Sequence, residues 1–110
     1  MTMKEKLENI LGGFLERNKE YAVELYIDNA VTNSRIGQIL ITSDRIYETN
    51  EKKLTVKWNI NHDIKFNECA FQYDQVLACY EETDKYNQQM IYVIMKNGME
   101  FDFGCIGMRI

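Results

Sequence analysis

The sequence predicts an α+β domain in which one N-terminal helix packs on a curled antiparallel sheet or a partly open barrel of six to seven strands. Three observations predict this class. Apolar side chains recur at helical spacing over residues 2–17, they alternate with polar ones over residues 20–108, and short polar turns separate the alternating segments. No strand–helix–strand pattern follows the helix, so hairpins are expected to join the strands.

The length and composition fit one globular domain over residues 1–110. Apolar residues make up 45% of the 110 positions and charged residues 27%, which is close to the globular average. Proline is absent, which argues against a flexible linker between modules. Thirteen basic and 17 acidic side chains leave a net charge of −4.

The helix is predicted from a cap and a stripe. Thr2 and Glu5 have the capping-box spacing, in which each side chain accepts a hydrogen bond from a backbone N–H of the first turn. Gly12 and Gly13 interrupt the pattern, yet the apolar phase continues beyond them, so we expect the helix to reach about Arg17. The stripe consists of Met3, Leu7, Ile10, Leu11, Phe14 and Leu15.

Strands are expected wherever the apolar period is two. The segment 68–74 fits either a turn of helix or an irregular loop, and 81–89 is expected to be a polar, flexible loop. The tail 105–110 either docks into its own sheet or is shared across a homodimer. The expected strands are 21–27, 37–42, 45–49, 54–60, a short 64–66, 76–80 and the two arms of a hairpin over 90–103.

Asn97-Gly98 predicts the turn of the last hairpin, because a two-residue type I′ turn requires positive φ at both central positions. In that register Lys96 faces Met99, and Tyr92 and Phe103 share the core side of the sheet. Asp102 then lies opposite Val93 on the other side.

The stretch GQILITSDRIY, Gly37–Tyr47, resembles the strand–turn–strand of GRAM and bacterial pleckstrin-homology-like domains. Those domains often carry a glycine, alternating apolar residues, a threonine, a polar turn and an arginine before another apolar pair. Asp63-Ile64 and the hairpin MIYVIMKNGMEFDF are similar to later strands of that superfold, so the resemblance spans residues 37–103. It implies a binding scaffold. A small Sm-like barrel, which begins with a helix, is an equally close analogy.

The sequence has few side chains in patterns typical of catalytic sites, and we expect no catalytic residue, no cofactor and no metal. His62 is the single histidine and lies in a polar stretch, where a solvated loop residue is expected. Cys69, Cys79 and Cys105 match neither a disulfide framework nor a zinc motif, which indicates reduced, buried thiols. We expect a cytoplasmic protein with no secretory signal and no membrane span.

Carboxylates offer one metal-binding alternative. Glu100 and Asp102 fall on one face of a strand, about 7 Å apart by strand geometry. Glu24, Asp28 or the loop with Glu81, Glu82 and Asp84 would have to complete a Mg²⁺ or Ca²⁺ site. Alternatively, these carboxylates bind no metal and simply face solvent, on one side of a sheet and in a loop.

The charge distribution points away from nucleic acid and towards a protein partner. Residues 66–84 hold five acidic and no basic side chains, which would repel phosphate. Tyrosine is enriched at protein interfaces, and several tyrosines border this acidic stretch. We expect a contact patch that binds a basic surface of another protein. Its residues are Tyr73, Tyr80, Glu81, Glu82, Asp84 and Tyr86.

The predicted function is therefore a small non-catalytic protein-binding module. It would act as an inhibitor, adaptor or accessory subunit of a larger protein, and its size and composition would suit a phage or mobile element. Two alternatives stay open: a pleckstrin-homology-like ligand or lipid binder, and a small enzyme using metal carboxylates or a Cys–His pair that joins His62 to Cys69 or Cys79.

Overall fold

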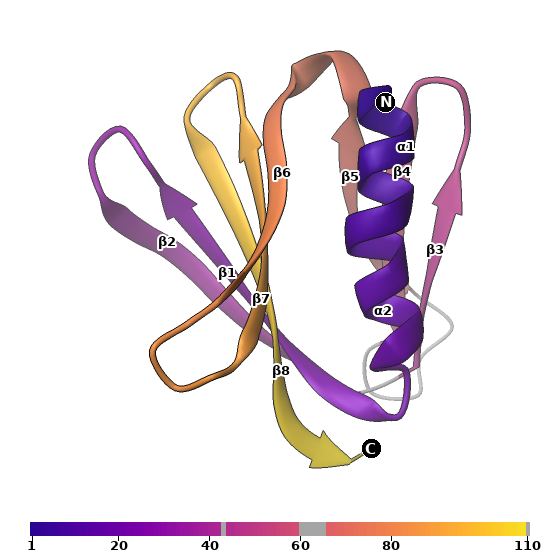
Figure 1. Cartoon of the computed structure of the whole chain (residues 1–110), viewed down its shortest axis with the longest axis vertical. Coiled ribbons are helices and arrows are strands. Elements are labelled where there is room, and N and C mark those ends of the chain that lie inside the picture. The colour runs from indigo at the N-terminus through magenta and orange to yellow at the C-terminus, as the bar shows by residue number, and fades with distance from the viewer. Residues whose placement is uncertain (43, 60–65, 110) are drawn as a thin grey trace.

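The computed structural model describes residues 1–42, 44–59 and 66–109. Within these ranges the chain forms one N-terminal helix and eight strands, arranged as two open antiparallel sheets (Figure 1). This confirms the α+β class and corrects the single curled sheet or six- to seven-stranded barrel. The strands are β1 (Tyr21–Asn29), β2 (Ser34–Ile41), β3 (Arg45–Thr49), β4 (Lys53–Asn59), β5 (Phe66–Gln72), β6 (Val76–Thr83), β7 (Gln89–Met95) and β8 (Met99–Arg109).

The helix runs from Met3 to Arg17, as the sequence predicts, in three continuous parts: α1 (Met3–Leu7), a π-helical segment (Glu8–Gly12) and α2 (Gly13–Arg17). The capping box is present, because the Thr2 hydroxyl accepts the Glu5 N–H at 3.2 Å and the Glu5 carboxylate accepts the Thr2 N–H. Among the described residues, no helix is long and apolar enough to cross a membrane.

Gly12 allows the helix to approach β3 closely. A Cβ atom at this position would lie 2.8 Å from Cζ of Tyr47, which is closer than van der Waals contact permits. Glycine is therefore retained in the helix interior despite its low helix propensity. The wider π-helical turn ends at this same residue.

The two sheets have the strand orders β2-β1-β8-β7-β6 and β3-β4-β5. The consecutive strands β5 and β6 enter different sheets because a 3₁₀ turn at Tyr73–Gln75 redirects the chain between them. This turn resolves the ambiguous segment 68–74, most of which belongs to β5. Strand β6 also continues to Thr83, so the expected flexible loop shrinks to a short turn before β7.

The core lies between the helix and the facing sides of both sheets. The apolar stripe of the helix supplies buried side chains, and each fully buried Leu, Val or Phe contributes about 1.5–3 kcal/mol through removal of apolar surface from water. The largest side chains with no exposed surface are Phe14, Phe71, Phe103, Leu7, Leu11, Leu25, Leu54 and Ile91.

The register of the last hairpin differs from the predicted one by one residue. Strand β7 ends at Met95 and β8 begins at Met99, so three residues form the turn, and the Gly98 N–H donates to the Met95 carbonyl at 3.0 Å. Gly98 has φ of +91°, whereas Asn97 keeps negative φ, as in a type I turn followed by a bulge. Phe103 therefore faces Ile91 in the core, and the predicted Tyr92–Phe103 pair is wrong.

A shift of one residue exchanges the two faces of a strand. Tyr92 consequently lies on the outer face of the five-stranded sheet, where it is directly opposite Asp102. At the other end of β8, the tail docks into its own sheet and places Arg109 opposite Tyr21. A homodimer through this tail stays a prediction.

Candidate functional site

A row of polar and aromatic side chains crosses the outer face of the five-stranded sheet. Directly paired residues of adjacent strands project to the same face, and the pairing runs without a break from β2 to β6. The rings of Tyr80 and Tyr92 stack with centroids 5.2 Å apart. We call this set the tyrosine row; its members are Gln38, Tyr26, Asp102, Tyr92 and Tyr80.

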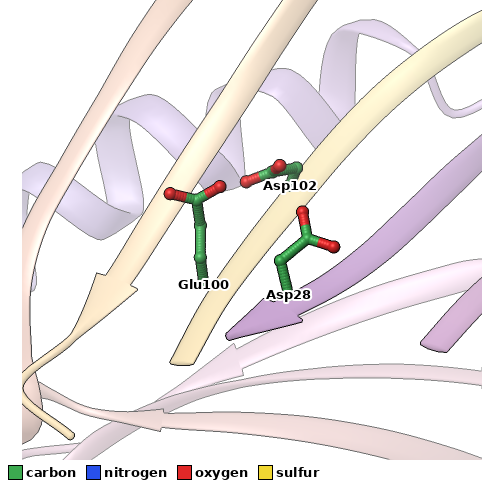
Figure 2. A group of neighbouring side chains, drawn as sticks. All are labelled: Asp28, Glu100 and Asp102. Atoms are coloured by element: carbon green, nitrogen blue, oxygen red, sulfur yellow. The ribbon is translucent and has the colours of Figure 1, made fainter. Parts of the chain in front are cut away.

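Beside the tyrosine row, three carboxylates converge. Asp28 on β1 is directly opposite Glu100 on β8, and each lies two residues from a member of the row. One oxygen from each of Asp28, Glu100 and Asp102 lies within 4.8 Å of the others, and Figure 2 shows the three carboxylates directed towards one another. We call these three residues the carboxylate cluster. Three negative charges so close together repel strongly unless a proton or cation separates them.

Asp102 is the buried member of the carboxylate cluster. Only 7% of its surface is exposed, and no residue in the described part of the chain hydrogen-bonds its Oδ1 atom. Burial, followed by the charge of Glu100 and a hydrogen bond with it, raises the pKa of Asp102 from 3.8 to about 8. In the absence of a cation, burial and the neighbouring charge therefore favour the protonated form of the Asp102 carboxyl.

Arg35 balances one side of the carboxylate cluster. Its Nε atom donates to Asp28 Oδ1 at 2.9 Å, and its guanidinium lies 4.4 Å from the centroid of the Tyr26 ring. The Tyr26 hydroxyl donates in turn to Glu24, which also accepts from Gln38 at 2.9 Å. The β1–β2 side of the face is thus held by one ion pair and by hydrogen bonds from neutral groups to Glu24, while no basic group among the described residues forms an ion pair with Asp102 or Glu100.

The predicted contact patch is divided by the fold. Tyr80 and Glu82 lie on the outer face, since Tyr80 faces Tyr92 and Glu82 faces Met90. Glu81, one position between them, projects to the opposite face, where its carboxylate lies 3.8 Å from Arg17. Alternation along a strand separates these neighbours in the sequence.

The other three predicted patch residues occupy different surroundings. Tyr73 packs against the core beside the 3₁₀ turn. Asp84 caps the β6–β7 turn, where its Oδ1 atom accepts the N–H groups of Tyr86 and Gln88, each at 2.9 Å. The Tyr86 side chain at the tip of this turn is 76% exposed. Two of the six residues therefore share the face that carries the carboxylate cluster.

Sequence reasoning placed Glu100 and Asp102 on one strand face and named Asp28 among their potential partners. The structure brings those three together, and Glu81 and Asp84 lie outside the cluster. Tyr92 was missed because the predicted register put it in the core. Asn97-Gly98 also fits a three-residue turn in which the glycine alone has positive φ, and that turn length gives the observed register.

The alternative of a Cys–His pair receives no support from the thiols. Burial raises the pKa of Cys69 to about 12 and that of Cys79 to about 11, so both stay protonated and weakly nucleophilic at neutral pH. His62 and Asp63 lie outside the described residues.

Comparison with known proteins finds no matching family model, and neither a curated protein nor a solved structure matches the chain significantly. The resemblance of residues 37–103 to GRAM and pleckstrin-homology-like domains therefore stays a prediction.

Proposed function

We propose that the chain is a protein-binding module whose contact surface is the outer face of the five-stranded sheet. The observation that carries this proposal is the combination of stacked, partly exposed tyrosines with an excess of carboxylates on a face opposite the core. The paired positions of this face in the described sheet carry one guanidinium, that of Arg35. The carboxylates are those of Glu24, Asp28, Glu82, Glu100 and Asp102.

Such a face suits a basic partner surface. Tyr80 and Tyr92 offer large contact area with little side-chain entropy to lose, which is why tyrosine is enriched at interfaces. A Lys or Arg of the partner would meet unbalanced negative charge beside the rings. The module would then serve as an inhibitor, adaptor or accessory subunit, with association that weakens as salt screens the opposite charges.

The test is affinity capture from the native host with matched variants. Tagged wild-type chain should retain one stoichiometric partner at low salt and release it at high salt. Y80S and E82K alter the outer face, whereas Y86S and E51K make the same changes at exposed positions outside it. We expect the first pair to lose the partner and the second pair to retain it.

Two outcomes would overturn the proposal. Retention of the partner by both Y80S and E82K would show that the outer face is not the contact surface. Loss of the partner in Y86S alone would move the surface to the β6–β7 turn, where Asp84 and Tyr86 of the original patch lie. Circular dichroism of each variant confirms that the fold is intact before capture.

A further inference from the structure

We propose that Asp28, Glu100 and Asp102 bind one hard divalent cation, of which Ca²⁺ is the best match, at the centre of the outer sheet face. This goes beyond binding of a protein partner, because the site is complete within one chain. Hard cations of this class prefer carboxylate oxygens, and three carboxylates with open positions for water suit a partly exposed site.

The first support is the spacing of the oxygens. Ca²⁺ binds oxygen at about 2.3–2.6 Å, so two ligands on opposite sides of the ion lie about 4.6–5.2 Å apart. The three carboxylate oxygens of the cluster lie within 4.8 Å of one another, which allows one ion to contact all three. Figure 2 shows the side chains arriving from the two adjacent strands β1 and β8.

The second and independent support is the buried oxygen of Asp102. Oδ1 is almost without exposure and has no hydrogen-bond partner in the described part of the chain. A buried carboxylate oxygen without a partner is costly, and native proteins usually satisfy such a group with a hydrogen bond, a water or an ion. The Asp102 carboxylate is directed towards Glu100 and Asp28, so a cation in the cluster would bind this buried and incompletely satisfied group (Figure 2).

Arg35 does not already fill this role. Its contact is made by Nε to Oδ1 of Asp28 at 2.9 Å, and half of its side chain is exposed at the sheet edge. A carboxylate can engage two cations, one through each oxygen, so the Arg35 contact leaves Asp28 able to bind an ion. Glu100 and Asp102 have no basic partner among the described residues.

The ligands stand on a rigid frame, which favours binding over rearrangement. Asp28 and Glu100 are directly opposite in the β1–β8 ladder, and Asp102 lies two residues further along β8. Tyr26 and Tyr92 are directly opposite Asp102 on either side, and 7% of the Asp102 surface is exposed. Their phenol rings also lie near enough to the cluster to report on a lanthanide there.

Terbium luminescence and calorimetry test the site with the purified chain alone. Tb³⁺ replaces Ca²⁺ at oxygen sites and emits when a nearby tyrosine is excited. After treatment with a chelator, we expect saturable emission at one Tb³⁺ per chain, displaced by Ca²⁺, and a one-site Ca²⁺ isotherm in calorimetry.

Matched variants decide whether the carboxylate cluster holds the ion. D102N and E100Q remove one ligand charge each and should weaken Ca²⁺ binding by more than about tenfold. E82Q removes the same charge from the same face outside the cluster and should leave the affinity unchanged. If circular dichroism shows that D102N does not fold, the Ca²⁺ affinity of E100Q is compared with that of E82Q instead, since Glu100 is more exposed than Asp102.

The proposal is overturned if Ca²⁺, Mn²⁺ and Mg²⁺ all give neither heat nor displacement of Tb³⁺. It is also overturned if E82Q weakens binding as much as D102N and E100Q, which would indicate diffuse attraction to the acidic face. Failure of ion binding leaves the capture experiment untouched, so the two proposals are judged separately.

Discussion

Replacement of Asp102 by asparagine tests the central electrostatic feature of the outer face. The Asp102 side chain is 7% exposed, and burial together with Glu100 raises its pKa to about 8. Asparagine has nearly the same shape and carries no titratable proton. We expect the stability of D102N relative to the wild type to increase between about pH 5 and about pH 9.

The sign follows from proton binding. Above the ordinary pKa of 3.8 the unfolded chain releases the Asp102 proton, whereas the folded chain retains it up to about pH 8. The folded state therefore holds more protons in this window, and stability falls as pH rises through it. The contribution is fully present below the unfolded pKa and is lost once pH exceeds the folded pKa.

The size of the stability difference follows from the gap between the unfolded and folded pKa values of Asp102. Each pH unit between the two pKa values corresponds to about 1.4 kcal/mol, so the span from 3.8 to about 8 has an upper limit of about 5–6 kcal/mol. Glu100 and Asp28 are partly exposed, and solvent screens their charges. We therefore expect the wild type to lose about 2–4 kcal/mol relative to D102N between the two pH values.

The groups that face Asp102 come from every strand around it. Glu100 lies on the same strand β8, Asp28 on β1 raises the pKa further, and Arg35 on β2 lowers it. Tyr92 on β7 and Tyr26 on β1 are directly opposite. Burial raises the pKa of Tyr92, with a further increase from Asp102, so this phenol stays neutral across the window.

Urea denaturation followed by circular dichroism and by fluorescence of the buried Trp58 provides the assay. Chelator keeps divalent ions away from the carboxylate cluster. Titrating groups that do not interact with Asp102 are shared by the two proteins and cancel in the difference between the free energies of unfolding. The measured difference therefore reports Asp102 together with its neighbours Glu100 and Asp28. A difference that stays constant from about pH 5 to about pH 9 would refute the reasoning.

Three further predictions concern packing, the last turn and the thiols. Gly12→Ala should lower the free energy of unfolding by about 1–3 kcal/mol in urea titrations, because its Cβ atom would overlap a tyrosine ring of β3. Gly98→Ala should cost more than about 1 kcal/mol by the same measurement, because an L residue at φ of +91° is strained and its Cβ atom would lie 2.7 Å from a valine methyl. Cys79 should react with a thiol reagent only as the protein unfolds, because it is buried and burial raises the pKa of its thiol.

Each of these three predictions has a control within the chain. Gly13→Ala meets only the end of a flexible arginine side chain and should be neutral or stabilising. Asn97→Ala should cost less than Gly98→Ala, and the reverse order would favour the two-residue turn. Cys105 is half-buried, and a rate no faster than that of Cys79 in the folded protein would contradict the assignment of thiol protection to burial.

Local pattern predicted the elements because their causes are local. The capping spacing of Thr2 and Glu5 and the stripe through Phe14 and Leu15 predict a helix to Arg17 without reference to any tertiary contact. Period-two alternation likewise located β3 at Arg45–Thr49 and β4 to within a residue at each end of the expected segment. Glycine at position 12 could be flagged as unusual, but only β3 explains why a Cβ atom is excluded there.

Strand pairing was harder to predict because its causes lie far apart in the chain. A 3₁₀ turn of three residues separates β5 from β6 and divides one expected sheet into two. One extra residue in the last turn moves Tyr92 from the predicted core to the outer face. Neither change alters the apolar alternation along the strands, so the sequence pattern is compatible with both arrangements.

The sequence by itself determined the α+β class, the helix, the strand segments and the placement of Glu100 and Asp102 on a common strand face, since all of these follow from spacing along the backbone. Only the tertiary structure decided that Asp28 joins them, that tyrosines flank them and that Asp102 is desolvated. The physical reason is that burial and charge repulsion depend on neighbours contributed by other strands. The chemistry of the outer face therefore arises when β1 and β7 pair with the two sides of β8.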